Sequence, residues 1–235
     1  MKAGKLILHI GLIAIIIVLG ILVYRSIVTP MRFEDECNRR RDACAEKLKV
    51  IRTLQEAHKM AYGVYAANLD SLIIDLQQGK QPVVKKEILG EIPEDMTEAM
   101  AVKQGLMRRD TVYMNPLEKL REEKKLFKVN SEGDTIYITN DEELFELKYI
   151  PVKAKEGQPR MQFVSNADTI RRSGLLVPVF EVKVDLKDLL WDLDQQAVVN
   201  KIAGIERVED ASGNKKYAGW KIGSMEDPIT DGNFE

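Results

Sequence analysis

This sequence has few thiol and imidazole side chains, the groups that bind zinc and act as nucleophiles or bases. The only thiols and imidazoles belong to Cys37, Cys44, His9 and His58. On a helix, the two cysteines would share a face and lie about 10 Å apart along the axis, which is too far for a disulfide between them. They are therefore either small buried apolar residues or partners in an intermolecular disulfide with a neighbouring copy.

An acidic segment close to the C-terminus offers oxygen ligands. It contains Glu226, Asp227, Thr230, Asp231 and Asn233. Hard oxygen ligands on a loop suit calcium, so Asp227 and Asp231 are candidate ligands. The spacing differs from that of an EF-hand loop, and an acidic tail is also commonly just a solvated segment. Calcium is thus the one cofactor that the sequence raises.

The sequence lacks the motifs of common enzymes. His9 lies inside an apolar run, as a functional or a helix-packing group, and His58 is expected at the surface. Two isolated histidines and two cysteines on a helix face do not form a zinc set. We find no Gly-rich phosphate loop, nucleophile elbow or Cys–His motif. We therefore predict a protein that is not an enzyme and has no small-molecule substrate.

The composition describes an ordinary solvated protein outside one apolar segment. The net charge is −2, with 31% charged and 6% aromatic residues. Such a chain has neither the basic excess nor the aromatic surface that nucleic-acid binding needs.

One uncharged segment, residues 6–24, stands at the N-terminus. As a helix it is about 28 Å long, close to the ~30 Å hydrocarbon core of a bilayer. It is longer than the core of a cleaved signal peptide and no Ala-x-Ala site follows it, so an uncleaved anchor is favoured. We predict a short tail over residues 1–5 and a transmembrane anchor over residues 6–28. Its membrane-facing side chains include Leu6, Ile10, Ile15, Leu19, Leu22 and Tyr24.

The charges that flank the anchor bear on its orientation. Lys2 and Lys5 precede it, whereas Arg25, Arg32 and residues 39–41 follow it. A strict count of lysines and arginines opposes export of the C-terminal region, but long domains can translocate regardless of charge. We expect the anchor in the inner (cytoplasmic) membrane, the N-terminus inside and the large C-terminal region outside the cytoplasm.

The elements after the anchor begin with a long amphipathic helix. Pro30 is expected to interrupt or end the first helix, and a second one is predicted over residues 33–62, ended by Gly63. Its apolar stripe packs either on the protein's own sheet or on a partner helix. The candidate interface is therefore formed by Phe33, Cys37, Cys44, Leu48, Ile51 and Leu54.

The remaining pattern predicts an α+β fold with an antiparallel sheet. We expect a pilin-like helix plus α/β region over residues 33–125 and a β-rich region over residues 126–235. Expected helices cover residues 68–78, 97–104, 118–125 and 195–205, the last with Val198, Val199 and Ile202 inward. Expected strands cover residues 81–89, 111–113, 135–138, 144–152, 160–164 and 175–185. In the last strand Phe180, Val182 and Val184 alternate with charged residues, which predicts one buried and one wet face.

Residues 51–72 carry a resemblance to a known family. The order Ile51, Leu54, Tyr62, Gly63 and Leu72 is similar to the segment that closes the N-terminal helix of type IV pilins and type II secretion pseudopilins. The resemblance covers residues 4–75 and implies an apolar anchor, an amphipathic helical continuation and an antiparallel sheet.

The same resemblance has two further consequences. Pseudopilins bind calcium in a C-terminal loop, which implies a similar role for Asp227 and Asp231. The sequence also departs from the family pattern, because Lys5, His9 and Ala66 stand where the family has Phe, Glu and Pro.

Three functions follow as hypotheses. The first is a non-enzymatic, single-pass component or accessory of an envelope secretion or pilus-type assembly. Its partners would be the lipid bilayer, other envelope proteins and further copies of itself. The second is a bitopic scaffold or adaptor that binds partners through its extracytoplasmic domain, for example at a sheet edge. The third is an anchored enzyme or ligand-binding domain, which would show a deep polar pocket.

Overall fold

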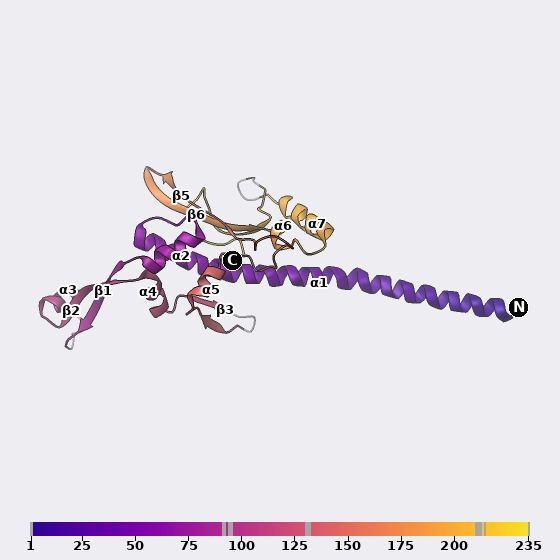
Figure 1. Ribbon diagram of the computed structural model, residues 1–235, viewed down its shortest axis with the longest axis horizontal. Coiled ribbons are helices and arrows are strands. Elements are labelled where there is room, and N and C mark those ends of the chain that lie inside the picture. The colour runs from indigo at the N-terminus through magenta and orange to yellow at the C-terminus, as the bar shows by residue number, and fades with distance from the viewer. Residues whose placement is uncertain are drawn as a thin grey trace. The chain divides into compact units, whose positions relative to one another are not determined.

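The structure is a computed structural model that describes residues 2–90, 93, 96–129, 133–209, 213 and 215–234, without the side chains of residues 2–10 and 14. It confirms the α+β class: a long apolar N-terminal helix precedes small antiparallel sheets and a β-rich C-terminal half (Figure 1). The chain forms two compact units. Unit 1 comprises Met1–Cys44, Pro151–Lys153 and Asp185–Trp220, and unit 2 comprises Ala45–Ile150, Ala154–Val184 and Lys221–Glu235. The predicted boundary at residues 125 and 126 stays a prediction.

Helix α1 (Lys2–Tyr62) is a single element that contains Pro30. The predicted interruption at Pro30 is therefore wrong. Proline removes one backbone hydrogen bond and costs about 3 kcal/mol inside a helix, but long helical segments on both sides hold the chain in this conformation. The predicted end is confirmed: Gly63 has a φ of 79°, a left-handed conformation that glycine adopts without steric cost.

Unit 1 adds two short helices to the first part of α1. These are α6 (Leu186–Leu189) and α7 (Gln195–Glu206), which begins at the predicted residue. Val198 of α7 is buried, whereas Val199 is 58% exposed, so the prediction that Val199 points inward is wrong. The buried face of α7 therefore includes Val198 but not the neighbouring apolar residue Val199.

The helices of unit 2 follow local signals in the sequence. Helix α2 (Leu69–Gln78) begins after Asn68, whose side chain accepts a hydrogen bond from the Asp70 N–H, as predicted. Helices α3 (Glu98–Lys103) and α4 (Pro116–Glu122) also lie where helices were expected. Helix α5 (Asp141–Glu146) occupies part of the predicted strand 144–152. That prediction is wrong because an Asn140 cap and three acidic residues in the first turn favour a helix there.

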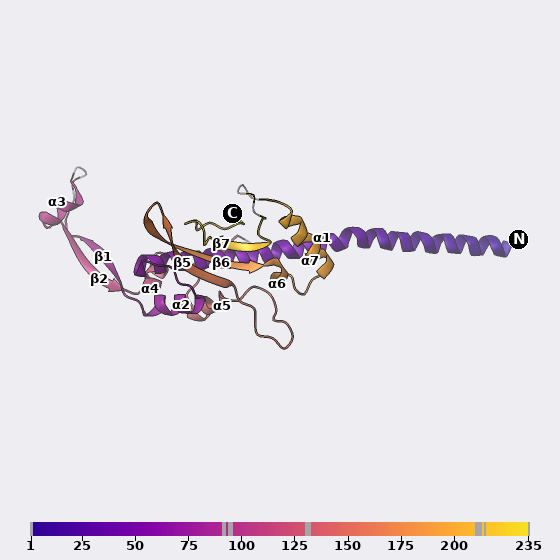
Figure 2. The same ribbon diagram turned by 90° about the horizontal axis from the view of Figure 1, so that it is seen from above.

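Antiparallel pairing joins the first strand to the second, the third to the fourth and the fifth to the sixth, and Figure 2 shows the first, second, fifth and sixth strands in another view. Strand β1 (Gln81–Ile88) pairs with β2 (Met107–Met114), and β3 (Phe127–Val129) pairs with β4 (Thr135–Tyr137). The third sheet has the order β5-β6-β7, with β5 (Val164–Arg172), β6 (Leu175–Asp185) and β7 (Gly219–Gly223). Strand β6 has the predicted bounds. The predicted strand 160–164 is wrong, because β5 begins only at Val164.

The turn between β5 and β6 and the faces of β6 follow from local chemistry. Ser173 and Gly174 both have positive φ, 49° and 85°, as a tight hairpin turn requires. Phe180, Val182 and Val184 are buried, which confirms one predicted face of β6. On the other face Glu181 is buried as well, so the prediction of a uniformly wet face is wrong.

The carboxylate of Glu181 is buried together with its counter-charges. The ammonium groups of Lys183 and Lys221 lie 2.7 Å and 3.2 Å from its oxygens. Burial alone would raise the pKa of Glu181, but the hydrogen bonds from both lysines outweigh this effect and lower it. Lys221 comes from β7, so the pairing of β7 with β6 makes this burial tolerable.

Candidate functional site

The first part of α1 leaves its apolar side chains uncovered. Every large apolar residue described between residues 12 and 27 is 53–62% exposed. Within the described part of the chain, α1 is the one helix that is long and apolar enough to cross a membrane. Its length and composition fit an anchor and fit a signal sequence. Of the predicted anchor residues, the exposed side chains are Ile15, Leu19, Leu22 and Tyr24, while the side chains of Leu6 and Ile10 lie outside the description.

The stripe along the second part of α1 packs inside the protein. Five of the six candidate interface side chains are at most 5% exposed: Cys37, Cys44, Leu48, Ile51 and Leu54. Packing of the stripe on the protein's own core is thereby confirmed. A partner could reach these five side chains only if the core opened, so their substitution would report on folding as well as on binding.

Phe33 begins the stripe and is half-buried. The ammonium of Lys201 in α7 lies 5.9 Å from its ring centroid and forms a 2.5 Å ion pair with Glu34. One turn later, burial raises the pKa of the Cys37 thiol. Cys37 and Cys44 are both buried, as the simpler interpretation of the two cysteines predicts, and the intermolecular disulfide stays a prediction.

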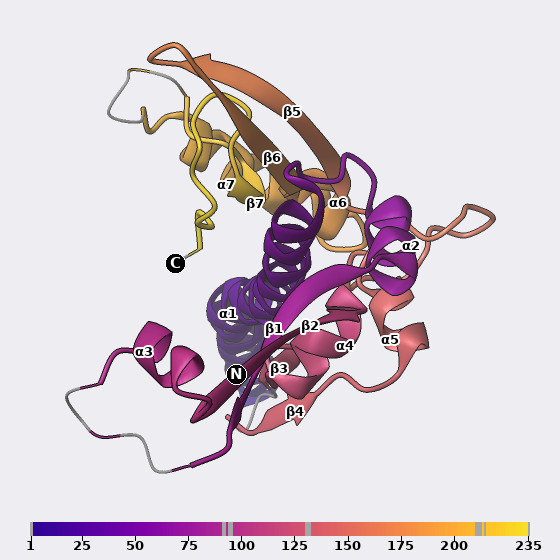
Figure 3. The same cartoon turned by 90° about the vertical axis from the view of Figure 1, so that its left-hand side faces the viewer.

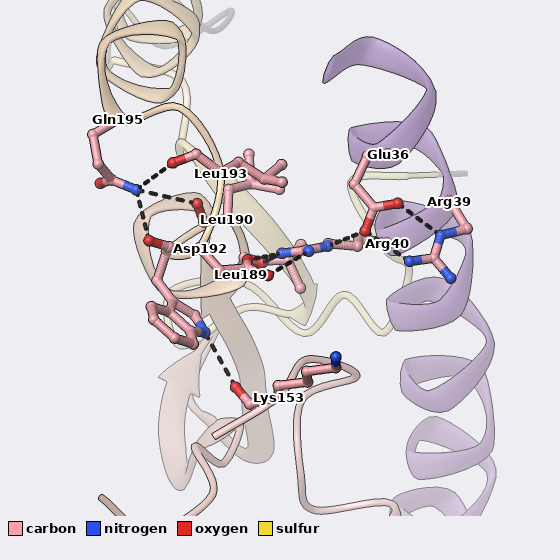
Figure 4. Close-up of polar contacts among 10 residues, drawn as sticks. Glu36, Arg39, Arg40, Lys153, Leu189, Leu190, Asp192, Leu193 and Gln195 are labelled. Carbon is pink, nitrogen blue, oxygen red and sulfur yellow. Dashed lines mark hydrogen bonds and ion pairs between the residues drawn. The ribbon is translucent and has the colours of Figure 1, made fainter. Parts of the chain in front are cut away.

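Arg40 is the centre of a polar network in unit 1 (Figure 4). Its side chain is 9% exposed and lies between two carboxylates, Glu36 one turn earlier on α1 and Asp192 after α6. The guanidinium donates to Glu36 at 2.7 Å, to both oxygens of Asp192 at 2.5 and 3.0 Å, and to the Leu189 carbonyl at 2.7 Å. This geometry is the planar, two-pronged contact that arginine makes with a carboxylate.

The two carboxylates respond to this network. A hydrogen bond from the Arg40 guanidinium is the main reason why the pKa of Asp192 lies below its usual range. The pKa of Glu36 is also lowered, first by a hydrogen bond from Arg39 and then by Arg40. All three groups are thus held in their charged forms. The network joins α1 to the segment after α6 through hydrogen bonds between charged groups.

The segment after α6 is fixed by further hydrogen bonds. Gln195 donates its side-chain amide to the carbonyls of Trp191 and Leu193 at 2.7 and 2.9 Å. The Trp191 indole donates to the Lys153 carbonyl at 3.1 Å. Together with Arg40, these contacts hold Pro151–Lys153 and the α6–α7 connection in one unit (Figure 4).

The candidate calcium ligands lie beside arginines. Asp227 forms an ion pair with Arg172 at the β5–β6 turn, and Asp231 lies 3.8 Å from a guanidinium nitrogen of Arg52. Among the described residues, no three His, Cys, Asp or Glu side chains lie together as a metal site would require. The two arginines already supply positive charge to these carboxylates. Calcium binding by Asp227 and Asp231 stays a prediction.

His58 is buried, so its expected place at the surface is wrong. Its Nδ1 lies 2.7 Å from the Val64 carbonyl and its Nε2 lies 3.3 Å from the Asp75 carboxylate. The ring also contacts Tyr62, with centroids 4.7 Å apart. His58 thus joins the end of α1 to the loop and helix that follow. The predicted role of His9 concerns a side chain outside the described residues.

Sequence reasoning missed the buried polar residues of α1. Gln55 is fully buried: its amide donates to the Ala66 carbonyl at 2.7 Å, and its oxygen accepts from the Ala66 N–H at 2.9 Å. A proline at residue 66 could not donate that hydrogen bond. The presence of Ala66 where the pilin pattern has proline was therefore the one sign in the sequence that this N–H donates a hydrogen bond.

Comparisons with protein-family models, with curated proteins and with solved structures find no match for this chain.

Proposed function

We propose that this chain is a non-enzymatic, single-pass membrane protein, and a pilin- or pseudopilin-like component or accessory of an envelope secretion or pilus-type assembly. One observation carries the proposal: α1 begins as a bare apolar helix and continues without a break into a helix whose stripe is buried. A folded region that continues directly from an apolar anchor is what we expect of a protein that is held at a membrane and assembles with other proteins there. The proposed location is the inner membrane, with the C-terminal region outside the cytoplasm.

A charge placed in the anchor tests membrane insertion. Leu19→Arg puts a guanidinium near the middle of the apolar segment, where insertion would cost about 2.5–3.5 kcal/mol. We expect a large fraction of this variant to be released from membranes by alkaline carbonate, whereas the unchanged chain stays in the pellet.

Met31→Arg is the matched control. Met31 is 59% exposed on the same helix, close to the 54% of Leu19, but it lies beyond the predicted anchor. This variant should remain in the membrane pellet. Release of the unchanged chain by carbonate, or equal behaviour of both variants, would contradict the proposed anchor.

A bitopic scaffold or adaptor of another envelope complex is the second candidate. It is favoured by the β1–β2 sheet, which contains no third strand among the described residues and so leaves both edges unpaired. On this sheet Val84 and Tyr113 are 54% and 69% exposed. Edge strands of this kind can accept a partner's strand. Photo-crosslinks to an envelope protein from Tyr113, with none from α1, would support the scaffold over a pilin-like part.

A further inference from the structure

A groove in unit 2 is lined by residues from the last turns of α1 and from helix α4, and both helices are labelled in Figure 3. Its volume is about 280 Å³. The α1 wall is formed by Thr53, Glu56, Ala57 and Met60. These residues are spaced by three, four and seven positions, so they occupy a single face of the helix.

The opposite wall repeats this spacing. It is formed by Pro116, Lys119 and Leu120 of α4 and by Glu123 at its C-terminal cap. These two walls are helices, whose backbone groups already bond within the helix, while Gln81 of β1 and Phe127 of β3 line the rest of the groove. Such walls offer side chains to a ligand but no row of free backbone donors and acceptors.

The kind of ligand follows from these walls. An extended peptide needs backbone partners of the sort that a strand edge provides, and along α1 and α4 most of its polar groups would go unpaired. A helix satisfies its own backbone and needs only complementary side chains. The groove therefore suits a helix that inserts one or two apolar side chains between α1 and α4.

Two exposed apolar residues of the groove would contact the apolar side chains of the docked helix. Met60 is 66% exposed, and Phe127 of β3, at one side of the groove, is 43% exposed. A flexible thioether and an aromatic ring adapt well to a partner's apolar anchors. The floor between them includes the buried residues Ala57 and Leu120.

Charged residues line the rim, with Glu56 on the α1 wall and Lys119 and Glu123 on the α4 wall. Within the described part of the chain, Glu56 on α1 and Lys119 on α4 make no hydrogen bond or ion pair with their side chains. Glu123 is paired with Lys125 at 2.7 Å, and its pKa is lowered first by the hydrogen bond from Lys125 and less by the charge of Lys119. A docked helix would therefore place a basic side chain towards Glu56 and an acidic one towards Lys119.

We propose that this groove binds an amphipathic helix of a partner protein, one whose apolar anchors are flanked by a basic edge and an acidic edge. The inference rests on the proposed role as an assembly component, and it names the surface and the partner chemistry. It also accounts for partner binding without opening the buried stripe of α1.

Designed peptides test the inference on the full chain in detergent. Three labelled helical peptides share the same leucine anchors and differ in their edges: one basic and one acidic, both basic, or both acidic. Fluorescence anisotropy measures the binding of each. We expect the mixed peptide to bind about tenfold more tightly than the other two, which corresponds to two exposed charge pairs.

Single charge reversals then predict a change of preference. Glu56→Lys should make the acidic peptide the best ligand, and Lys119→Glu should make the basic peptide the best ligand. The matched control is Glu87→Lys on β1, an exposed charge outside the groove, which should leave the preference unchanged. Circular dichroism confirms that each variant is folded.

Three results would overturn the inference. They are absence of binding by the mixed peptide, preferences that ignore Glu56 and Lys119, and equal binding of a peptide whose helix is broken by a central proline. The assay takes place in detergent, so failure of the membrane anchor in the carbonate test is a separate result.

Discussion

Arg40 ties the stability of unit 1 to the charge of two carboxylates. The guanidinium is almost fully buried, and Asp192 and Glu36 neutralise it. A buried arginine without these partners would keep its charge and lose its compensation. Unit 1 also contains Trp191 and Trp220, and these are both tryptophans of the sequence. Because Trp220 lies in β7, whose neighbouring strand is β6, a Trp220→Phe background leaves Trp191 as the fluorescent reporter of unit 1.

Asp192 should make unit 1 less stable in acid. Its pKa is lowered in the folded protein by the hydrogen bond from Arg40, so the folded state binds fewer protons than the unfolded state near pH 4. The stabilisation is thus fully present above the unfolded pKa and is lost as pH falls through the folded pKa. We expect the urea midpoint, followed by tryptophan fluorescence, to drop between pH 5 and pH 3, as expected for a carboxylate.

Asp192→Asn should flatten this pH dependence. Asp35→Asn is the control, because Asp35 is an exposed carboxylate on α1, the helix that carries Arg40. It should keep the slope of the unchanged chain. Equal slopes for Asp192→Asn and the unchanged chain would show that Asp192 does not carry the effect.

The residues of this network could not be recognised from sequence. Arg40 stands in a run of charged residues on the polar side of an amphipathic pattern, where solvent exposure is the default expectation. Its partner Asp192 is 152 positions away along the chain. A pattern within one helix carries no information about a carboxylate so distant.

At the scale of elements, the helices and strands that were predicted correctly are those with a clear local signal, such as a capping residue or alternating apolar residues. The bounds of α2 and β6 follow from the Asn68 cap and from alternating apolar residues, and both were predicted well. Pro30 shows the opposite case, because a local helix breaker is overridden by the helix on either side. Helix α5 was missed because an apolar run suggested a strand, although Asn140 and the acids after it favour a helix start.

The junction of α1 with the following loop depends on Gln55. Gln55→Leu would leave the N–H and carbonyl of Ala66 buried without partners, at a cost of about 2–4 kcal/mol. We expect a lower urea midpoint by circular dichroism and faster amide hydrogen exchange around residue 66. Gln78→Leu, the same change at an exposed position of α2, should alter neither.

A second substitution separates the two hydrogen bonds. Ala66→Pro removes the N–H that Gln55 accepts and introduces the residue of the pilin pattern. Once that N–H is absent, Gln55→Leu leaves one fewer group unpaired. The double variant should therefore lose less free energy of unfolding than the sum of the two single variants. Strict additivity would contradict the paired arrangement.

At the scale of the whole molecule, the sequence pattern indicated the class but not the division into units. The apolar anchor, the long amphipathic helix and the later strands were enough to predict an α+β chain. Unit 1 joins Met1–Cys44 to Asp185–Trp220, and no local pattern connects segments so far apart. Arg40 and Asp192 are the contact that shows this connection most directly.

The orientation of the molecule in the membrane sets the last prediction. Lys2 and Lys5 precede the anchor, and Arg25 and Arg32 follow it. If the C-terminal region lies outside the cytoplasm, protease added to spheroplasts should digest it and leave a short protected fragment that contains the anchor.

Lys2→Gln with Lys5→Gln should reduce the digested fraction, because the cytoplasmic side loses its positive charge. Arg25→Gln with Arg32→Gln should increase that fraction, since fewer positive charges then have to cross. A C-terminal region that resists protease in spheroplasts but is digested in inside-out vesicles would place it in the cytoplasm. That result would exclude an exported assembly component while leaving the anchor itself intact.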